Sequence, residues 1–409
     1  MAGFVAFQWK GGDYYYSPSH HKIFSRPDTD IPPPEDHVGP PSGIHIRNLY
    51  LNLSAGCNLR CEYCFTPADA PSSDVNMGPE VIRAAIMKLG HWWASQPTRA
   101  SATITFFGGE PLLNREGLQY AVYFAEEWKR SFGIPFSFSI STNGTLVTEA
   151  DIRFFRDHDI FVWFSIDGPP EIHDRRRRFR SGNASSHRLA IEHAAWALRM
   201  LPPPRVGVRA TLSEGAGKLS EIVNYLGLQG FKVISTSGVE PNQIEQCSLD
   251  EQDLQCLAEG LDDCADVLLR WRKCGVRSFP LELDLLSLDR GTSSGRFICD
   301  AGRGSLTVDP QGGLFPCHRF VGQQNYALGS VTGEINLAPC EQFAGLDYAA
   351  IPGCKDCWAR KFCLGSCVGA SAAAGLPLGH PYAQHCKERK LYALISLKCA
   401  VEEGHGLLT

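Results

Sequence analysis

The chain has 409 residues, of which 44% are hydrophobic and 20% charged, a composition typical of a globular protein with a substantial core. Its formal net charge of −5 argues against binding to nucleic acid or to an anionic membrane, and the run Arg175 to Arg178 is too short to change this. No apolar run approaches the length of a membrane span, and the N-terminus lacks the pattern of an export signal. We therefore expect a cytoplasmic protein, in which 16 cysteines indicate metal or redox chemistry rather than disulfides.

The first 44 residues show no regular alternation. The stretch FVAFQWKGGDYYYS predicts a hairpin that turns at Gly11, Gly12 and Asp13. The stretch SRPDTDIPPPEDHVGPPSG predicts an extended proline-rich linker. We treat residues 1–44 as a separate N-terminal segment.

From residue 45 onward, strand-like and helix-like segments alternate. Strands are predicted at residues 48–54, 102–108, 136–142, 161–167, 205–212 and 231–238, and amphipathic helices at 79–95, 114–131, 148–158, 185–200 and 217–228, with Thr148 as a helix cap. This alternation is typical of an α/β protein with a parallel sheet. Six strands fall short of the eight in a closed barrel, so we expect a partial (β/α)6 TIM-like barrel over residues 45–240.

The rest of the chain changes character twice. Residues 249–275 predict one amphipathic helix and residues 276–296 a connector, so we interpret residues 241–296 as a bridging helical segment. From Phe297 onward Gly, Pro and Cys become dense and the periodicity fades. We predict a second, cysteine-rich domain over residues 297–409.

The stretch SAGCNLRCEYCF directly follows the first barrel strand and spaces Cys57, Cys61 and Cys64 as C-x3-C-x2-C. Three thiolates on a [4Fe-4S] cluster would leave one iron open to an external ligand, whereas a structural zinc site is closed by four ligands. Half of a zinc site is the alternative interpretation. Because the motif follows the carboxyl end of a strand, it would lie on the face where barrels of this type carry out chemistry.

Further polar or glycine-rich segments follow the next strands. They are FFGGEP after the second strand, STNGT after the third, SIDGP after the fourth and VRATL on the fifth. Gly108 and Gly109 would let the backbone approach an ammonium group closely, and Glu110 would add a charge-assisted hydrogen bond. Each has a structural alternative, such as a tight turn for the glycines or a loop cap for Asp167. Their occurrence at consecutive strand ends favours one shared site.

Together these motifs resemble those of radical SAM enzymes. The resemblance implies that a reduced cluster cleaves S-adenosylmethionine to methionine and a 5′-deoxyadenosyl radical, which then takes a hydrogen atom from a substrate. The residues implied in SAM binding are Gly108, Gly109 and Glu110 for the methionyl amine, Ser165 and Arg177 for the carboxylate, Asn143 and Asp167 near the ribose, and Arg209 for either part or, alternatively, for a salt bridge in the barrel.

Apart from Cys340, which shows no ligand spacing, seven more cysteines lie between residues 299 and 386. They are Cys299, Cys317 in Gly312-x4-Cys, Cys354-x2-Cys357-x5-Cys363-x3-Cys367, and Cys386. Two zinc ribbons would need eight ligands, whereas this spacing resembles the SPASM extension of radical SAM proteins. That resemblance implies two auxiliary [4Fe-4S] clusters, one held by Cys299, Cys317 and Cys367 and one by Cys354, Cys357, Cys363 and Cys386. Spacing alone would equally allow a sequential grouping.

Two positions bear on the reaction. Sulfatase maturases of this family typically carry Asp after the Gly-x4-Cys cysteine, as a base, and Gln before GGE, whereas this chain has His318 and Phe107. We therefore predict a peptide maturase that installs a thioether or carbon–carbon crosslink within a ribosomally made precursor peptide. His318 is its candidate base, with a hydrogen bond near a cluster ligand as its alternative role.

The resemblance also implies two partners, the precursor peptide and an electron donor such as flavodoxin or ferredoxin. The N-terminal segment is too short and proline-rich for a winged-helix leader-binding domain; it could hold a peptide by strand addition or simply cover the barrel. The first alternative function is an anaerobic sulfatase-maturating enzyme that forms formylglycine. The remote alternative is a non-catalytic metal-binding scaffold.

Overall fold

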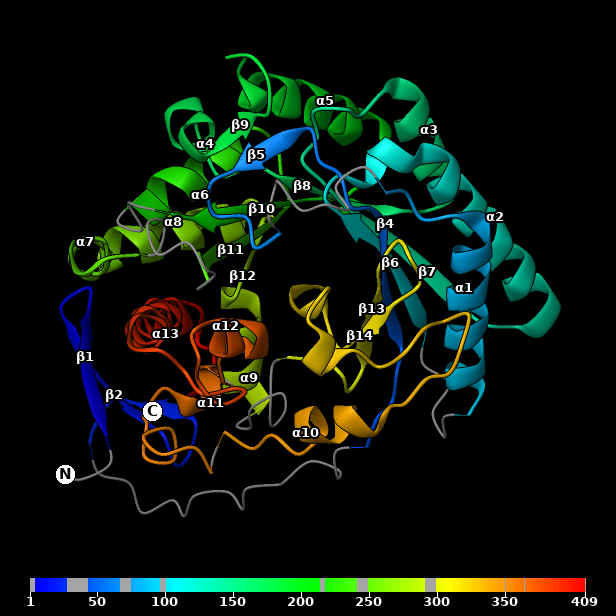
Figure 1. The fold of residues 1–409 in the computed structure, drawn as a ribbon. Helices are drawn as coiled ribbons and strands as arrows, with labels where there is room; N and C mark the ends of the chain where they lie inside the picture. The colour runs from blue at the N-terminus through cyan, green and yellow to red at the C-terminus, as the bar shows by residue number, and fades with distance from the viewer. Residues whose placement is uncertain are drawn as a thin grey trace.

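A computed structural model describes residues 4–27, 43–66, 75–95, 101–213, 218–240, 249–290, 299–348, 350–363 and 365–408. The six predicted strands are β4 (Asn48–Ser54), β6 (Ala102–Gly108), β7 (Phe136–Thr142), β8 (Phe161–Ser165), β10 (Val206–Leu212) and β11 (Val233–Gly238). They lie side by side in chain order, and every neighbouring pair is parallel. Figure 1 shows them as an open arc, which confirms the predicted α/β class and partial barrel.

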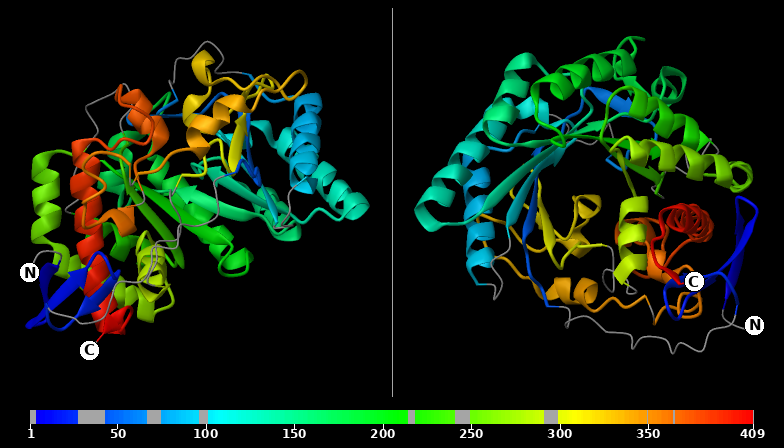
Figure 2. Two further views of the ribbon diagram at one scale, coloured as in Figure 1. Left: turned by 90° about the horizontal axis from the view of Figure 1, so that it is seen from below. Right: turned by 180° about the vertical axis from the view of Figure 1, so that it is seen from behind.

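Helices between the strands cover the outer face of the arc (Figures 1 and 2). They are α1 (Pro79–Ala94), α2 (Arg115–Phe132), α3 (Glu149–Asp157), α5 (Ser186–Met200) and α6 (Leu219–Leu228). The start of α3 is the predicted cap: Thr148 Oγ1 accepts from the Asp151 amide at 3.2 Å, and Asp151 accepts from the Thr148 amide at 2.9 Å. Alternate strand residues such as Leu49 and Leu51 are buried in the core with these helices. The intervening residues face the inside of the arc, which we call the lumen.

Two segments differ from the prediction. The single helix expected at residues 249–275 is divided at Gly260 into α7 (Glu251–Glu259) and α8 (Leu261–Lys273), since glycine is a poor helix former. The expected connector contains β12 (Arg277–Phe279), which pairs with β11, and α9 (Leu281–Arg290). Three residues of strand are too few to give a recognisable alternation. Residues 241–248 and 291–298 lie outside the described chain.

The cysteine-rich region fills the open side of the arc (Figures 1 and 2). Its first strand, β13 (Ser305–Val308), pairs in parallel with β4 and carries β14 (Leu314–Phe315) on its other edge. The sheet therefore takes strands from both predicted domains. Beyond it come α10 (Glu341–Ala344), α11 (Arg360–Cys363), α12 (Val368–Ala373) and the long α13 (Ala383–Glu403), with a small separate core that includes Phe320 and Phe343.

The N-terminal segment forms the predicted hairpin, β1 (Val5–Trp9) and β2 (Gly12–Ser17). Its turn lies one residue earlier than expected, at Lys10 and Gly11, because Gly12 already pairs with Trp9. Together with β3 (Lys22–Phe24) and β15 (Leu407–Leu408), the hairpin makes a separate four-stranded sheet that joins the two ends of the chain. Of the predicted linker at residues 25–43, residues 28–42 lie outside the described residues.

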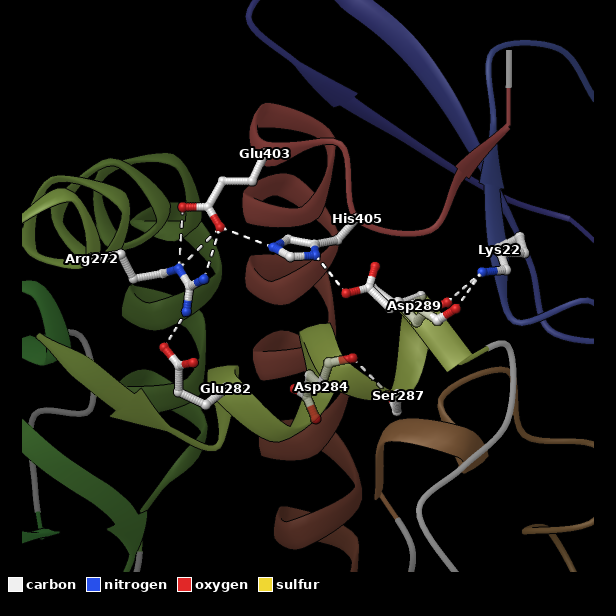
Figure 3. A network of polar contacts seen from close by, with 9 residues as sticks. Lys22, Arg272, Glu282, Asp284, Ser287, Asp289, Glu403 and His405 are labelled. Carbon is white, nitrogen blue, oxygen red and sulfur yellow. Dashed lines mark hydrogen bonds and ion pairs between the residues drawn. The ribbon is translucent and has the colours of Figure 1, made fainter. Parts of the chain in front are cut away.

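A polar network fastens the end of α13 to its neighbours (Figure 3). Arg272 of α8 donates to Glu403 at 3.0 Å, and His405 lies 2.8 Å from Asp289 at the end of α9. Lys22 of β3 donates to the Leu288 carbonyl at 2.7 Å. The bridging helices, α13 and the N-terminal sheet are thus held together by side chains from all three. None of the helices in the described chain is long and apolar enough to cross a membrane.

Candidate active site

The C-x3-C-x2-C motif lies in the loop that follows β4, at the carboxyl end of the sheet. The loop contains β5 (Leu59–Cys61), which pairs antiparallel with β9 (Arg177–Phe179), so that Cys61 lies opposite Arg177. Figure 1 shows the two strands side by side. The sequence did not predict this ribbon, because three-residue strands carry no periodicity. It ties the cysteine motif to the segment that follows α4 (Pro170–Arg176).

The three motif cysteines are not joined by disulfides, and they influence one another electrostatically. Burial, and then the nearby Glu110 carboxylate, raise the pKa of Cys57 to about 11. Burial raises the pKa of Cys61 to about 12 against the opposing charge of Arg177, and Cys64 adds to the rise in both. Burial therefore disfavours the thiolates of Cys57 and Cys61 unless a bound metal, which deprotonates the thiols that coordinate it, stabilises them.

The donor set fits an iron–sulfur cluster. Across the described ranges, no three His, Cys, Asp or Glu side chains converge on a point where a single metal ion would bind. A cubane makes a different demand, since each cysteine thiolate binds its own iron at a separate corner. Cys57, Cys61 and Cys64 supply three such thiols around one end of the lumen, and three is the number that leaves one iron for an external ligand.

The glycines of FFGGEP lie against this loop. A Cβ atom on Gly109 would come within 2.2 Å of the Gly56 carbonyl oxygen, and one on Gly108, whose φ is +132°, within 2.4 Å of the Ser54 oxygen. The amides of Gly109 and Glu110 donate to those same carbonyls at 2.9 and 2.8 Å. The close approach of two backbones is thus one complete reason for the two glycines. Their binding of a methionyl amine stays a prediction.

Glu110 is fully buried between the ends of β6 and β7. Its carboxylate accepts hydrogen bonds from Thr142 Oγ1 at 2.7 Å and from the amides of Asn143 and Leu112 at 2.8 and 3.1 Å. Burial raises its pKa to about 7 despite these donors. A carboxylate held in this way is poised to gain from a cationic ligand, because an ammonium group would compensate the charge that burial disfavours.

Asn143 contacts the cysteine motif directly. Its Nδ2 atom lies 3.8 Å from Cys57 Sγ and donates to Asn58 Oδ1 at 2.9 Å. Asn58 in turn donates to Thr145 at 2.8 Å, and Thr145 donates back to Asn143 at 2.7 Å. Sequence reasoning missed Asn58 and Thr145, although both lie inside segments that it singled out. The closed ring of hydrogen bonds fixes the loop around Cys57; contact of Asn143 with a ribose stays a prediction.

Asp167 is the centre of a second network. Its Oδ2 accepts from Arg177 Nε at 2.9 Å and from Tyr63 at 2.5 Å, and its Oδ1 accepts from the Thr211 amide at 2.9 Å. Burial alone would raise the pKa of Asp167, but the Arg177 guanidinium holds it below its usual range. Arg177 also reaches Cys61 Sγ at 3.9 Å. Asp167 thus positions Arg177 and Tyr63 beside the cysteine motif, and sequence reasoning missed Tyr63.

Ser165 and Arg209 are neighbours across β8 and β10 and face the lumen. The Arg209 guanidinium stacks on the Trp163 ring at 4.5 Å. Solvent reaches it, but the surrounding protein lowers its pKa. In the part of the chain that the structure describes, Arg209 makes no ion pair, so the predicted alternative of a barrel salt bridge is not found there. SAM contact by either residue stays a prediction.

His318 brings the cysteine-rich region into the lumen. Its ring lies 4.8 Å from the ring of Phe107, 5.1 Å from that of Phe65 and 5.7 Å from that of Tyr50. Burial lowers its pKa to about 3. We call these four residues the aromatic cage. Phe65 follows Cys64 of the predicted SAM-binding cluster, and His318 follows Cys317 of the first predicted auxiliary cluster. The cage therefore lies between these two predicted sites.

Apart from Cys340 and Cys399, which are buried in the hydrophobic core, the seven spaced cysteines of the C-terminal region fall into two groups in space. Burial raises the pKa of Cys299 to about 11 and that of Cys317 to about 12, and in both the next contribution comes from Cys367. The remaining four cysteines line one cavity of about 250 Å³: Cys354, Cys357, Cys363 and Cys386. These neighbourhoods are interleaved along the chain rather than sequential. An auxiliary cluster in each group stays a prediction.

Comparison with known proteins gives matches to most of the chain. Residues 51–197 match the model of the radical SAM superfamily. The cysteine-type anaerobic sulfatase-maturating enzyme of Clostridium perfringens is 25% identical over 78% of this chain and 88% of its own length. The radical SAM cyclopropyl synthase TigE of Paramaledivibacter caminithermalis is 24% identical over 80% of this chain and 69% of its own length.

Two solved structures share the fold. The chain matches anSMEcpe with bound AdoMet at a TM-score of 0.70 and 20% identity, over 87% of this chain and 97% of that one. It matches Streptococcus suis SuiB bound to S-adenosylmethionine at a TM-score of 0.57 and 14% identity, over 84% of this chain and 77% of that one. At these identities the likeness concerns the fold.

Proposed function

The chain belongs to the radical SAM superfamily, and we propose that it is a peptide maturase that oxidatively installs an intramolecular thioether or carbon–carbon crosslink in a ribosomally made precursor peptide. It is an enzyme with a [4Fe-4S] cluster and SAM as cofactors. We place it in the cytoplasm, where thiols stay reduced. Its electron donor would be a flavodoxin or a ferredoxin.

The residues that would hold the cofactors are those of the two networks in the motif loop. Cys57, Cys61 and Cys64 would bind the first cluster, with Glu110 facing the methionyl amine and Arg177 the carboxylate. The seven C-terminal cysteines would hold two auxiliary clusters. When bound, these groups supply a one-electron reductant, a sulfonium whose cleavage yields a 5′-deoxyadenosyl radical, and an acceptor for the electron that the peptide later loses.

The observation that carries the proposal is the aromatic cage. It joins Phe65, next to the motif that would form the radical, to His318, next to a cysteine that would bind an auxiliary cluster. A peptide residue in the lumen beside the cage would thus lie between a radical source and an electron acceptor. That arrangement suits a reaction in which hydrogen-atom removal is followed by oxidation.

Because the crosslinking reaction must release a proton, we propose that His318 accepts it. Crosslinking removes two hydrogens from the peptide: one leaves as a hydrogen atom to the 5′-deoxyadenosyl radical, and the other as a proton and an electron. The imidazole at the lumen wall is neutral and is placed to receive that proton, and its lowered pKa means that it would pass the proton on rather than keep it. The assignment depends on the position of His318 among Tyr50, Phe65 and Phe107.

The second candidate function is that of an anaerobic sulfatase-maturating enzyme, the name of the C. perfringens relative, which in this proposal would form formylglycine. The two positions that depart from the sulfatase-maturase pattern, Phe107 and His318, are in ring contact at 4.8 Å. The two substitutions therefore lie at one place in the lumen wall, where the Gln and Asp typical of sulfatase maturases are replaced by the contacting rings of Phe107 and His318. TigE, named a cyclopropyl synthase, is similar over 80% of this chain and favours a bond-forming reaction.

The test uses enzyme reconstituted with iron and sulfide under anaerobic conditions, a reductant, SAM, and a short peptide encoded beside the gene. We expect 5′-deoxyadenosine together with a peptide that has lost two hydrogens, located by fragmentation to a new internal link. A product that reacts with a hydrazide would carry an aldehyde and indicate formylglycine instead. Cys61→Ala is the inactive control. A holoenzyme that leaves SAM intact would contradict the proposal.

A further inference from the structure

The barrel lumen contains an arginine that the networks of the motif loop do not use. Arg177 is buried and paired with Asp167 at 2.9 Å. Arg209, in contrast, has neither an ion pair nor a hydrogen-bond acceptor among the residues that the structure describes. Its side chain is exposed, yet it extends from the middle of β10 into the lumen rather than from the outer surface. A molecule that enters the lumen can therefore reach this cation.

Arg209 lies on an aromatic platform. Its guanidinium carbon is 4.5 Å from the centre of the Trp163 ring, and that ring lies 4.9 Å from the ring of Phe161. Gly207, on the same face of β10 as Arg209, makes room for the platform, because a Cβ atom there would come within 2.7 Å of the Trp163 ring. A guanidinium that stacks through its face keeps the N–H groups of its edge free, and this edge matches a carboxylate in bidentate geometry.

The charge of Arg209 reaches the aromatic cage. Burial raises the pKa of Tyr50, and Arg209 is the first group that opposes this rise. Burial lowers the pKa of His318, and Arg319 and then Arg209 lower it further. Arg209 therefore lies within electrostatic range of two of the four cage residues. A peptide residue beside the cage would have this guanidinium close by.

The charge of Arg209 lacks a compensating group in the described chain. The surrounding protein lowers its pKa, because burial disfavours the charged form. A carboxylate in the lumen would supply the missing charge. The methionyl carboxylate of SAM would lie at the open iron, beside Cys61 and Arg177, whose Sγ and Nη1 atoms are 3.9 Å apart. The substrate is therefore the source of a carboxylate for Arg209.

We propose that Arg209 binds a carboxylate of the precursor peptide and thereby places a neighbouring peptide residue beside the aromatic cage. The proposal rests on the proposed function, since it names the substrate feature that the crosslinking reaction would recognise. The carboxylate belongs either to an acidic side chain or to the C-terminus of the peptide. The contact is a charge-assisted hydrogen bond, in which no proton or electron is transferred. A peptide without the carboxylate would leave the guanidinium unpaired, and this difference selects the substrate.

The experiment is a double-mutant cycle on the reconstituted holoenzyme with SAM, read by fluorescence anisotropy. The probe is the peptide encoded beside the gene, labelled at its N-terminus. It is compared with copies in which each Asp or Glu is replaced in turn by its amide, and with a copy whose C-terminus is amidated. We expect Arg209→Gln to lower the affinity for the unaltered peptide roughly tenfold or more. For one altered peptide the wild type and Arg209→Gln should bind equally, because the carboxylate is already absent. The matched control is Arg205→Gln, directly before β10, where Arg205 pairs with the exposed Asp159; it should leave every affinity within about twofold.

Each result has a defined meaning. If Arg209→Gln lowers the affinity for all the peptides equally and that for SAM as well, Arg209 binds the methionyl carboxylate and the proposal is wrong. Modification of a peptide that lacks every carboxylate at the rate of the unaltered one would also overturn it, and would leave the proposed function intact. Iron content shows whether each variant assembles. If Arg209→Gln does not, Arg209→Lys decides by the same cycle, because it keeps the charge but loses the bidentate geometry and should retain only part of the preference. A wild-type holoenzyme that neither binds the peptide nor cleaves SAM with dithionite would contradict the proposed function itself.

Discussion

Two of the three predicted cluster sites, the motif loop and the group of four C-terminal cysteines, are built in different ways. The motif loop after β4 is held by the β5–β9 ribbon, by backbone pairing with Gly109, and by the side chains of Asn143 and Asp167. The cavity of the four C-terminal cysteines is enclosed by turns, by the short helix α11 and by the start of α13, where His385 contacts Cys363 at 3.6 Å. The first site is therefore shaped by the sheet before any cluster binds. In the second, Cys354 and Cys357 lie in a segment of turns with little regular structure to shape it, so cluster binding and local folding should be coupled in that segment.

Removal of iron should produce the largest difference between the two sites. In chelator-treated protein we expect amides of residues 350–363 to exchange with solvent at nearly unstructured rates, while β4 and β6 keep most of their protection. The reason is that the cavity would lose its central group, whereas the strands keep their ladders. Hydrogen exchange read by mass spectrometry measures both regions in one sample. Equal protection of residues 350–363 and of β4 and β6 after iron removal would contradict the proposed difference between the two sites.

Within the preorganised site, the Asp167 network should dominate stability. Asp167→Ala leaves the buried Arg177 guanidinium without its partner and removes an acceptor from Tyr63. We expect a loss of about 3–5 kcal/mol in the free energy of unfolding, measured by urea titration. Glu62→Gln, which breaks the more exposed pair with Arg176, should cost less than about 1 kcal/mol. Equal effects would mean that Asp167 is not the centre of the loop.

Most of the motif-loop site could be predicted from the sequence, because its residues lie at the ends of strands that the sequence identifies. Strands such as β4 and β7 follow from apolar alternation, and function gathers where parallel strands end, so Cys57, Glu110 and Asp167 could be placed on one edge before the structure was known. The partners Tyr63 and Asn58 could not, because their contacts depend on how the loop crosses the sheet. The pairing of β13 with β4 was also missed, since it joins residues that are far apart in the sequence.

The raised pKa of Glu110 should make the stability of the preorganised site depend on pH. Burial raises the pKa of Glu110 to about 7, above its value in an unfolded chain, so the folded state binds more protons in this range. The contribution of Glu110 to stability is thus greatest below about pH 4.5 and is lost as the pH rises to about 7. Comparing Glu110→Gln with the wild type by urea unfolding at pH 5 and pH 8, we expect the variant to gain relative stability at the higher pH. Glu116→Gln, at an exposed position of α2, is the control, and parallel pH profiles for Glu110→Gln and the wild type would contradict the assignment.

The smallest effect is expected in the network at the end of α13 (Figure 3). Glu403→Gln weakens the contacts to Arg272 and His405, but all three side chains are about a fifth to a quarter exposed, so the pairs are screened by water. We expect a loss of about 0.5–1 kcal/mol that shrinks further at high salt. The measurement is urea unfolding of the holoenzyme at two ionic strengths, beside Cys357→Ala as the variant that removes a predicted cluster ligand. If Glu403→Gln proved as damaging as Cys357→Ala, polar contacts rather than a bound cluster would hold the C-terminal region, and the contrast between the two sites would lose its physical basis.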